Sequence, residues 1–123
     1  NLTDESIVLK ADFICKYSSE SEIIEKKNYI KLKRESSQPI REKTSGSTFK
    51  NPSGKYAAAL IEQAGCKGMK NGGASVSTIH ANFIINNGEA TALDIENLGK
   101  KIIIKVKEKF GITLEWEIKI IGK

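Results

Sequence analysis

The clearest constraint on the fold is a helix pattern late in the chain, over residues 92–110. Its apolar residues recur three and four positions apart, so they line one face of a helix. These residues are Ile95, Leu98, Ile102, Val106 and Phe110. Thr91 followed by Asp94 predicts a capping box at the start, and Gly111 predicts the end. Such a helix covers a core on one side only.

The other predicted elements are short, and the strands do not follow one another directly. In chain order they are a strand at 6–16, helices at 20–32 and 55–64, and strands at 81–86 and 113–121. The last strand alternates cleanly, with an apolar face made of Leu114, Trp116, Ile118 and Ile120. Few strands separated by helices favour an α+β fold, in which helices pack on one face of a small sheet.

Two loops interrupt these elements. Residues 34–54 are rich in Ser, Thr and Gly, contain both prolines and lack periodicity. A loop of this length in a compact domain is typically functional. Residues 65–73 form a second loop, which holds four of the ten glycines.

Composition narrows the function classes. A chain of 123 residues with 39% apolar and 28% charged residues is expected to form one globular domain over 1–123. The net charge of +5 comes almost entirely from Lys, with few Arg and no interleaved aromatics, so nucleic-acid binding is not favoured.

No apolar run is long enough to span a membrane, and the polar start is unlike a signal peptide. One His and two separated Cys predict neither a metal site nor a disulfide framework, and Cys15 is expected to be buried in the first strand. This cysteine usage favours the reducing cytoplasm.

Four features could carry chemistry. Ser47 follows Gly46 in the long loop and could be a proton donor, a nucleophile, a phosphate ligand or an ordinary turn residue. Its surroundings fit neither a nucleophile elbow nor a P-loop. His80 is the only histidine, and Glu117 is a candidate acid or base on the polar face of the last strand. The Asn-Pro pair at 51–52 predicts a helix start, whose free N–H groups suit an anion.

Several motifs, in order along nearly the whole chain, resemble those of the UDP-N-acetylenolpyruvoylglucosamine reductases. The matching stretches are RESSQP (34–39), SGSTFKNP (45–52), ALIEQAG (59–65), GGASVS (72–77), HANFIIN (80–86) and LEWEIKIIG (114–122). In that family these motifs belong to the C-terminal, substrate-binding domain of a larger flavoenzyme. The resemblance therefore implies that N-terminal FAD-binding domains, absent from this sequence, belong to the same polypeptide.

The resemblance also implies a reaction. Family members use NADPH and FAD to reduce UDP-N-acetylglucosamine enolpyruvate to UDP-N-acetylmuramate, a cytoplasmic step of peptidoglycan precursor synthesis that supports cell wall biogenesis, cell shape and cell division. Ser47 falls on the family's proton-donating Ser, and Glu117 falls on its catalytic Glu. Implied substrate-binding residues are Arg34, Lys50, Asn51 and His80. No cofactor-binding or metal-binding residue is implied within this chain, and no membrane or nucleic-acid partner.

One departure concerns affinity. Many family members have Lys directly before Gln-Pro, whereas this chain has Ser37 there. Two other hypotheses remain: a stand-alone module that binds a UDP-sugar or another phosphorylated ligand, and a basic RNA-binding domain. The two Gly-rich loops and the net positive charge motivate the binding module.

Overall fold

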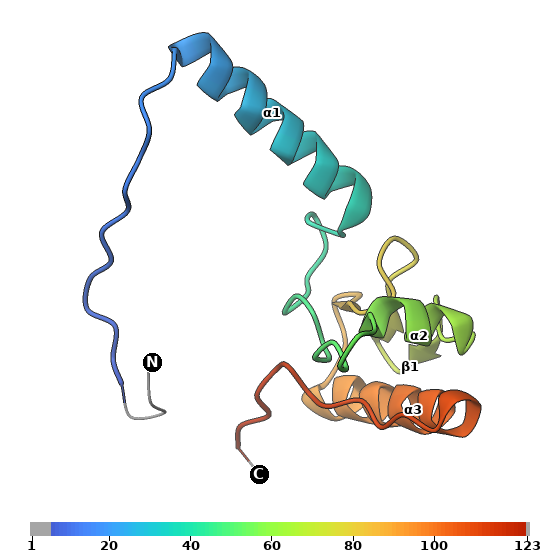
Figure 1. Cartoon of the computed structure of the whole chain (residues 1–123). Helices are drawn as coiled ribbons and strands as arrows, with labels where there is room; N and C mark the ends of the chain where they lie inside the picture. Colours follow the sequence, from blue (N-terminus) through green and yellow to red (C-terminus); the bar gives the residue numbers. More distant parts are fainter. Residues whose placement is uncertain (1–5, 123) are drawn as a thin grey trace.

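The computed structural model describes residues 6–122 of the chain. Within that range helices and strands follow in the order α1, α2, β1, β2, β3, α3 (Figure 1). Their bounds are α1 Glu20–Ser37, α2 Ala57–Gln63, β1 Lys70–Asn71, β2 Ala74–Val76, β3 Ile84–Asn86 and α3 Ala92–Phe110.

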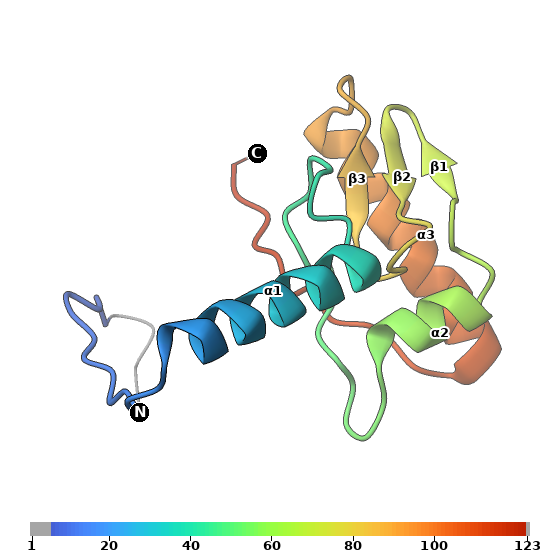
Figure 2. The ribbon, with the colours of Figure 1, turned by 90° about the horizontal axis from the view of Figure 1, so that it is seen from above.

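The sheet is a small antiparallel meander in the order β1-β2-β3. Lys70 pairs with Ser75 across the first two strands, and Ala74 pairs with Asn86 across the next two. Helix α3 packs against all three strands, and α2 packs against α3. Figure 2 shows the strands side by side in front of α3. The predicted α+β fold with helices on one face of a small sheet is confirmed.

Helix α3 has the bounds, caps and buried face that the sequence predicts. The Thr91 hydroxyl accepts from the Asp94 N–H at 3.1 Å, and the Asp94 carboxylate accepts from the Thr91 N–H at 2.9 Å. Gly111 ends the helix with a φ of 68°. The predicted stripe faces the core, with Leu98, Ile102 and Val106 fully buried and its two end residues partly buried.

The hairpin between β1 and β2 was missed, because residues 65–73 were interpreted as loop throughout. Asn71 pairs with Ala74, which leaves Gly72-Gly73 as a two-residue turn. Gly72 has a φ of 53°, and a Cβ on Gly73 would lie 2.4 Å from the backbone nitrogen of Ala90. Both glycines are therefore required by the turn and by the close approach of the segment that precedes α3.

The strand predicted over 6–16 is wrong. This segment forms neither helix nor strand, and it runs apart from the sheet in both views (Figures 1 and 2). Ile7 and Phe13 are each 84% exposed, and Cys15, expected to be buried, is exposed too. A strand needs a neighbour for its backbone groups, and none is present within the described residues.

Four further elements differ in their bounds from the prediction. The helix predicted at 20–32 forms as α1, capped by Ser19, but continues to Ser37, so the long loop begins at residue 38. The helix predicted at 55–64 begins at Ala57. The strand predicted over 113–121 pairs through a single bridge at Trp116, and beyond it Ile120 is 53% exposed. The strand predicted at 81–86 begins three residues later.

Candidate functional site

The segment 47–50 lies between two other segments and joins them by backbone hydrogen bonds. On one side, the Thr48 N–H donates to the Asn82 carbonyl at 2.8 Å, and Ser47 forms a bridge with Phe83. On the other side, the Glu117 N–H donates to the Thr48 carbonyl at 2.9 Å. These bonds place three segments that are far apart in the sequence next to one another.

Ser47 and Glu117 therefore lie on two hydrogen-bonded backbone segments, residues 47–50 and 115–117, which are called the frame below. Both side chains are exposed, whereas Thr48 and Phe49, which follow Ser47 in the sequence, are each 1% exposed. Gly46 precedes Ser47 with a φ of 90°, a conformation that favours glycine. A rigid, buried backbone thus presents two exposed functional groups on neighbouring segments.

The aromatic pair under this frame links it to α3. The rings of Phe49 and Trp116 lie 4.9 Å apart between centroids, tilted by 36°. Trp116 also lies against Gly99 of α3, where a Cβ would come within 2.0 Å of the indole ring. Sequence analysis placed Trp116 on the core face but gave no role to Gly99.

Lys50 and Asn51 lie next to the frame, and both already have partners. The Lys50 ammonium is 3.6 Å from the Glu115 carboxylate, an exposed ion pair. The Asn51 side-chain oxygen accepts from the Ala57 N–H at 2.9 Å. Asn51 therefore caps the start of α2, and the free helix N-terminus expected directly after Pro52 does not form there.

His80 has a local structural role. Its Nδ1 accepts from the Asn82 N–H at 3.3 Å, and its ring stacks edge-on against Phe83 at 4.7 Å. Burial lowers the pKa of His80, which keeps the ring neutral and Nδ1 available as an acceptor.

Arg34 lies on α1, which contacts none of the other described helices and strands. The structure therefore places Ser47, Lys50, Asn51 and Glu117 on or next to the two paired segments. His80 is linked to them through Asn82, whose N–H bonds the His80 ring and whose carbonyl bonds Thr48. The structure does not bring Arg34 into this group. Ser37, the position of the family Lys, donates to the Lys33 carbonyl at 2.7 Å.

Sequence reasoning missed Asn82, because that position stands between the matched motif residues. Asn82 is 4% exposed, and its amide bonds both backbone groups of Phe49. A polar residue inside the apolar run at 81–86 was the available signal, since buried polar side chains need partners.

Among residues 6–122, one buried side-chain oxygen, Thr48 Oγ1, has no hydrogen-bond partner.

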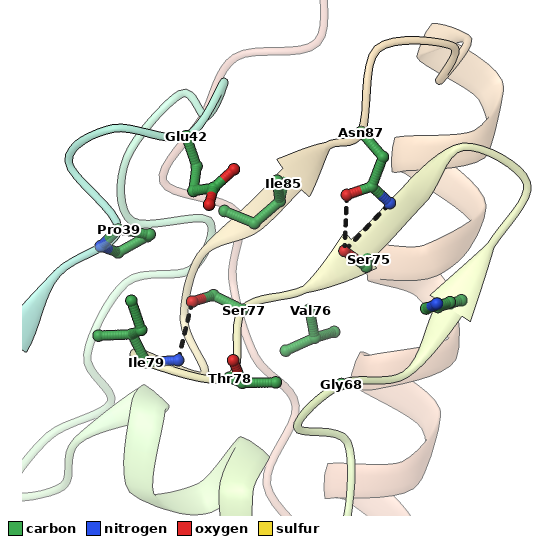
Figure 3. Close-up of a pocket in the computed structure, with 11 residues that line it drawn as sticks. Pro39, Glu42, Gly68, Ser75, Val76, Ser77, Thr78, Ile79, Ile85 and Asn87 are labelled. Carbon is green, nitrogen blue, oxygen red and sulfur yellow. Dashed lines mark hydrogen bonds between the residues drawn. The ribbon is translucent and has the colours of Figure 1, made fainter.

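The described surface has several hollows. One is lined by Lys50, Asn51 and Glu115, and another by Ser45, Trp116 and Ile118 together with residues of α3 and the C-terminal segment. A third lies on the sheet face opposite α3, with Ile85, Ser75, Asn87 and Glu42 around it (Figure 3). Neither Ser47 nor Glu117 lines any of these three hollows.

Residues 6–122 contain no cluster of three or more His, Cys, Asp or Glu suited to a metal ion. No helix in this range has the length and apolarity required to cross a bilayer.

Comparison with known proteins identifies the family. Residues 38–121 match the model described as UDP-N-acetylenolpyruvoylglucosamine reductase, C-terminal domain. The chain is 50% identical over 119 residues to the protein of that name from Parvibaculum lavamentivorans, covering 97% of this chain and 38% of the relative. It is also 50% identical over 123 residues to the one from Rickettsia conorii, covering 100% of this chain and 42% of the relative.

A solved structure agrees with the sequence matches. The crystal structure of UDP-N-acetylenolpyruvylglucosamine reductase (MurB) from Thermus caldophilus superposes with a TM-score of 0.67 and 37% identity, over 83% of this chain and 36% of that one. The chain thus spans about two fifths of the length of the curated relatives. It belongs to the UDP-N-acetylenolpyruvoylglucosamine reductase family, and its residues 38–121 correspond to the C-terminal domain.

Proposed function

We propose that this chain is the substrate-binding domain of a longer cytoplasmic flavoenzyme. The complete protein would reduce UDP-N-acetylglucosamine enolpyruvate to UDP-N-acetylmuramate for peptidoglycan synthesis, with NADPH as reductant. FAD-binding domains would precede this chain in the same polypeptide. The proposal extends the family membership to a whole activity, and it assigns roles to Ser47 and Glu117.

One observation carries the proposal. The Glu117 N–H bonds the carbonyl of Thr48, the residue next to Ser47, so the two family positions lie on adjacent segments with exposed side chains. Their exposure suits a site completed from outside this chain.

Reduction of the enolpyruvyl double bond adds one hydride and one proton. FAD, reduced by NADPH and held by the preceding domains, would supply the hydride to the vinyl carbon. Ser47 Oγ then donates its proton to the neighbouring carbon and regains one from solvent. Because Ser is a very weak acid, it donates only to a strongly basic, enolate-like centre, and only when tightly placed. Glu117 stabilises the enolic form of the substrate or assists proton delivery.

Substrate binding in this proposal uses the positions implied by the family motifs. Lys50 must exchange its ion pair with Glu115 for the anionic substrate, and such exposed pairs are weak enough to allow it. Asn51 and His80 contact the substrate through the groups not already bonded, the Asn51 amide N–H and the His80 Nε2. Arg34 joins the site only if α1 lies closer to the frame in the complete protein.

The test separates the two half-reactions in the complete protein. Ser47→Ala is expected to slow oxidation of the reduced flavin by the enolpyruvyl UDP-sugar by roughly 100-fold or more, the usual contribution of a general acid. Flavin reduction by NADPH should keep its rate. Stopped-flow absorbance of the flavin measures both steps.

Ser53→Ala is the matched control, since Ser53 is an exposed serine in the same connection before α2. Its two half-reactions should equal those of the unmodified protein. Equal loss of both half-reactions in Ser47→Ala, or loss of neither, contradicts the role of Ser47. A complete protein without bound flavin and without turnover would favour the stand-alone binding module instead.

A further inference from the structure

Asn82 holds the Ser47–Glu117 frame through its side chain. Its Oδ1 accepts from the Phe49 N–H at 3.0 Å, and its Nδ2 donates to the Phe49 carbonyl at 2.8 Å. Its own carbonyl accepts from the Thr48 N–H at 2.8 Å. One residue thus bonds three of the four backbone N–H and C=O groups of Thr48 and Phe49, and the fourth, the Thr48 carbonyl, accepts from Glu117.

These bonds complement those on the opposite side of the segment. The neighbouring groups of residues 48 and 50 pair with the last segment, through Glu117 N–H to Thr48 and Lys50 N–H to Glu115. Phe49 has its backbone groups bonded to the Asn82 amide instead. Because Phe49 is 1% exposed, water cannot readily replace that amide. Asn82 therefore determines how the segment lies relative to Glu117.

Asn82 is itself fixed by a tight turn. The Ser77 hydroxyl accepts from the N–H groups of Ile79, at 3.1 Å, and of His80, at 3.2 Å. The first of these bonds is visible in Figure 3 beside the sheet-face hollow. His80 Nδ1 then accepts from the Asn82 N–H. The Asn82 backbone is thus held in place by the turn that begins at Ser77 and by the His80 ring.

We propose that Asn82 is a positioning residue that keeps Ser47 in register with Glu117 for proton delivery. This inference rests on the proposed function. Asn is suited to the task because one carboxamide supplies both a donor and an acceptor to the same backbone residue. A shift of the frame by about 1 Å is enough to cost on the order of 100-fold in a proton transfer that depends on orientation.

The test uses Asn82→Ala in the complete protein, followed by stopped-flow measurement of the two half-reactions. We expect oxidation of the reduced flavin by the enolpyruvyl UDP-sugar to slow on the order of 100-fold. The rate of flavin reduction by NADPH should be unchanged. Asn82→Ser is the second variant, because its hydroxyl keeps a polar group at this buried position but is too short to replace both bonds to Phe49.

Asn86→Ala is the matched control. Asn86 also bonds backbone groups through its side chain, the N–H groups of Gly88 and Ala90, but in the loop before α3. The Asn86→Ala protein should oxidise its reduced flavin with the enolpyruvyl UDP-sugar at the unmodified rate, even if its melting temperature falls. A loss of rate in Asn86→Ala as large as in Asn82→Ala would show a general effect of weakened structure and overturn the proposal.

The double variant Ser47→Ala/Asn82→Ala separates positioning from general damage. If Asn82 acts through Ser47, the double variant is within about threefold of Ser47→Ala alone, since the group being positioned is already gone. Additive losses overturn the inference while leaving Ser47 as proton donor. Absence of turnover in the unmodified complete protein defeats the proposed function itself. Failure of both Asn82 variants to fold also overturns a positioning role separable from folding.

Discussion

Replacing Gly99 by Ala in α3 tests the packing beneath the candidate site. Ala is the better helix former by about 1 kcal/mol, so Gly99→Ala would stabilise an exposed helix. Here a Cβ would lie 2.0 Å from Trp116 Cη2 and 2.6 Å from Cζ3. Ordinary carbon contacts are about 3.5–4 Å, so the indole ring must move by roughly 1.5 Å. That ring is also in contact with Phe49.

We expect Gly99→Ala to destabilise the chain by about 1–2 kcal/mol. Overpacking a filled site typically costs about 1–3 kcal/mol, which exceeds the gain in helix propensity. Urea unfolding of the 123-residue chain measures the change. In a Trp116→Leu background the clash is removed, and the same substitution should become neutral or stabilising by up to about 1 kcal/mol.

Asn97→Ala, two residues earlier in α3, is the control for helix propensity alone. Asn97 is half-buried, and its change to Ala should be mildly stabilising in both backgrounds. The reasoning is refuted if Gly99→Ala stabilises the unmodified chain, or if the Trp116→Leu background leaves its effect unchanged.

Two further predictions concern polar contacts away from the core. Hydrogen bonds from the Thr91 backbone and side chain lower the pKa of Asp94 in the folded protein. The Asp94 carboxylate therefore stabilises the fold fully above the ordinary Asp pKa, and this stabilisation is lost as the pH falls through the lowered, folded-state pKa. Urea midpoints at pH 3 and pH 7 should therefore differ less in Asp94→Asn than in the unmodified chain or in Asp12→Asn. Asn51→Ala should lower the free energy of unfolding by about 1 kcal/mol through loss of the α2 cap, while Asn51→Asp keeps the cap and most of that stability. Equal urea midpoints for these two Asn51 variants would refute the capping role.

Sequence pattern was most reliable where the determining interactions are local. The bounds and caps of α3 were predicted because capping residues, helical spacing and a terminal glycine all act within a few positions. The β1–β2 hairpin is also local, and its Asn-Gly-Gly stretch is a known turn signal. It was missed because strands of two and three residues are too short to show alternation.

The candidate site was predictable only in part, since its geometry depends on distant pairings. Motif resemblance singled out Ser47 and Glu117, but no local pattern shows that Thr48 pairs with Glu117. The same limit hid Asn82, whose partner Phe49 lies 33 positions away. For Asn51 the motif gave a substrate contact, but it did not show the bond from the Ala57 N–H to the Asn51 side-chain oxygen, six positions apart.

The two strand errors have a common physical origin. Apolar alternation indicates that one face of a segment is buried, but it does not identify the partner that buries it. In 113–121 the partner is present for the first half, where Leu114 is 2% exposed, and missing for the second, where Ile121 is 89% exposed. In 6–16 no partner is present among the described residues, and the chain spans about two fifths of its relatives.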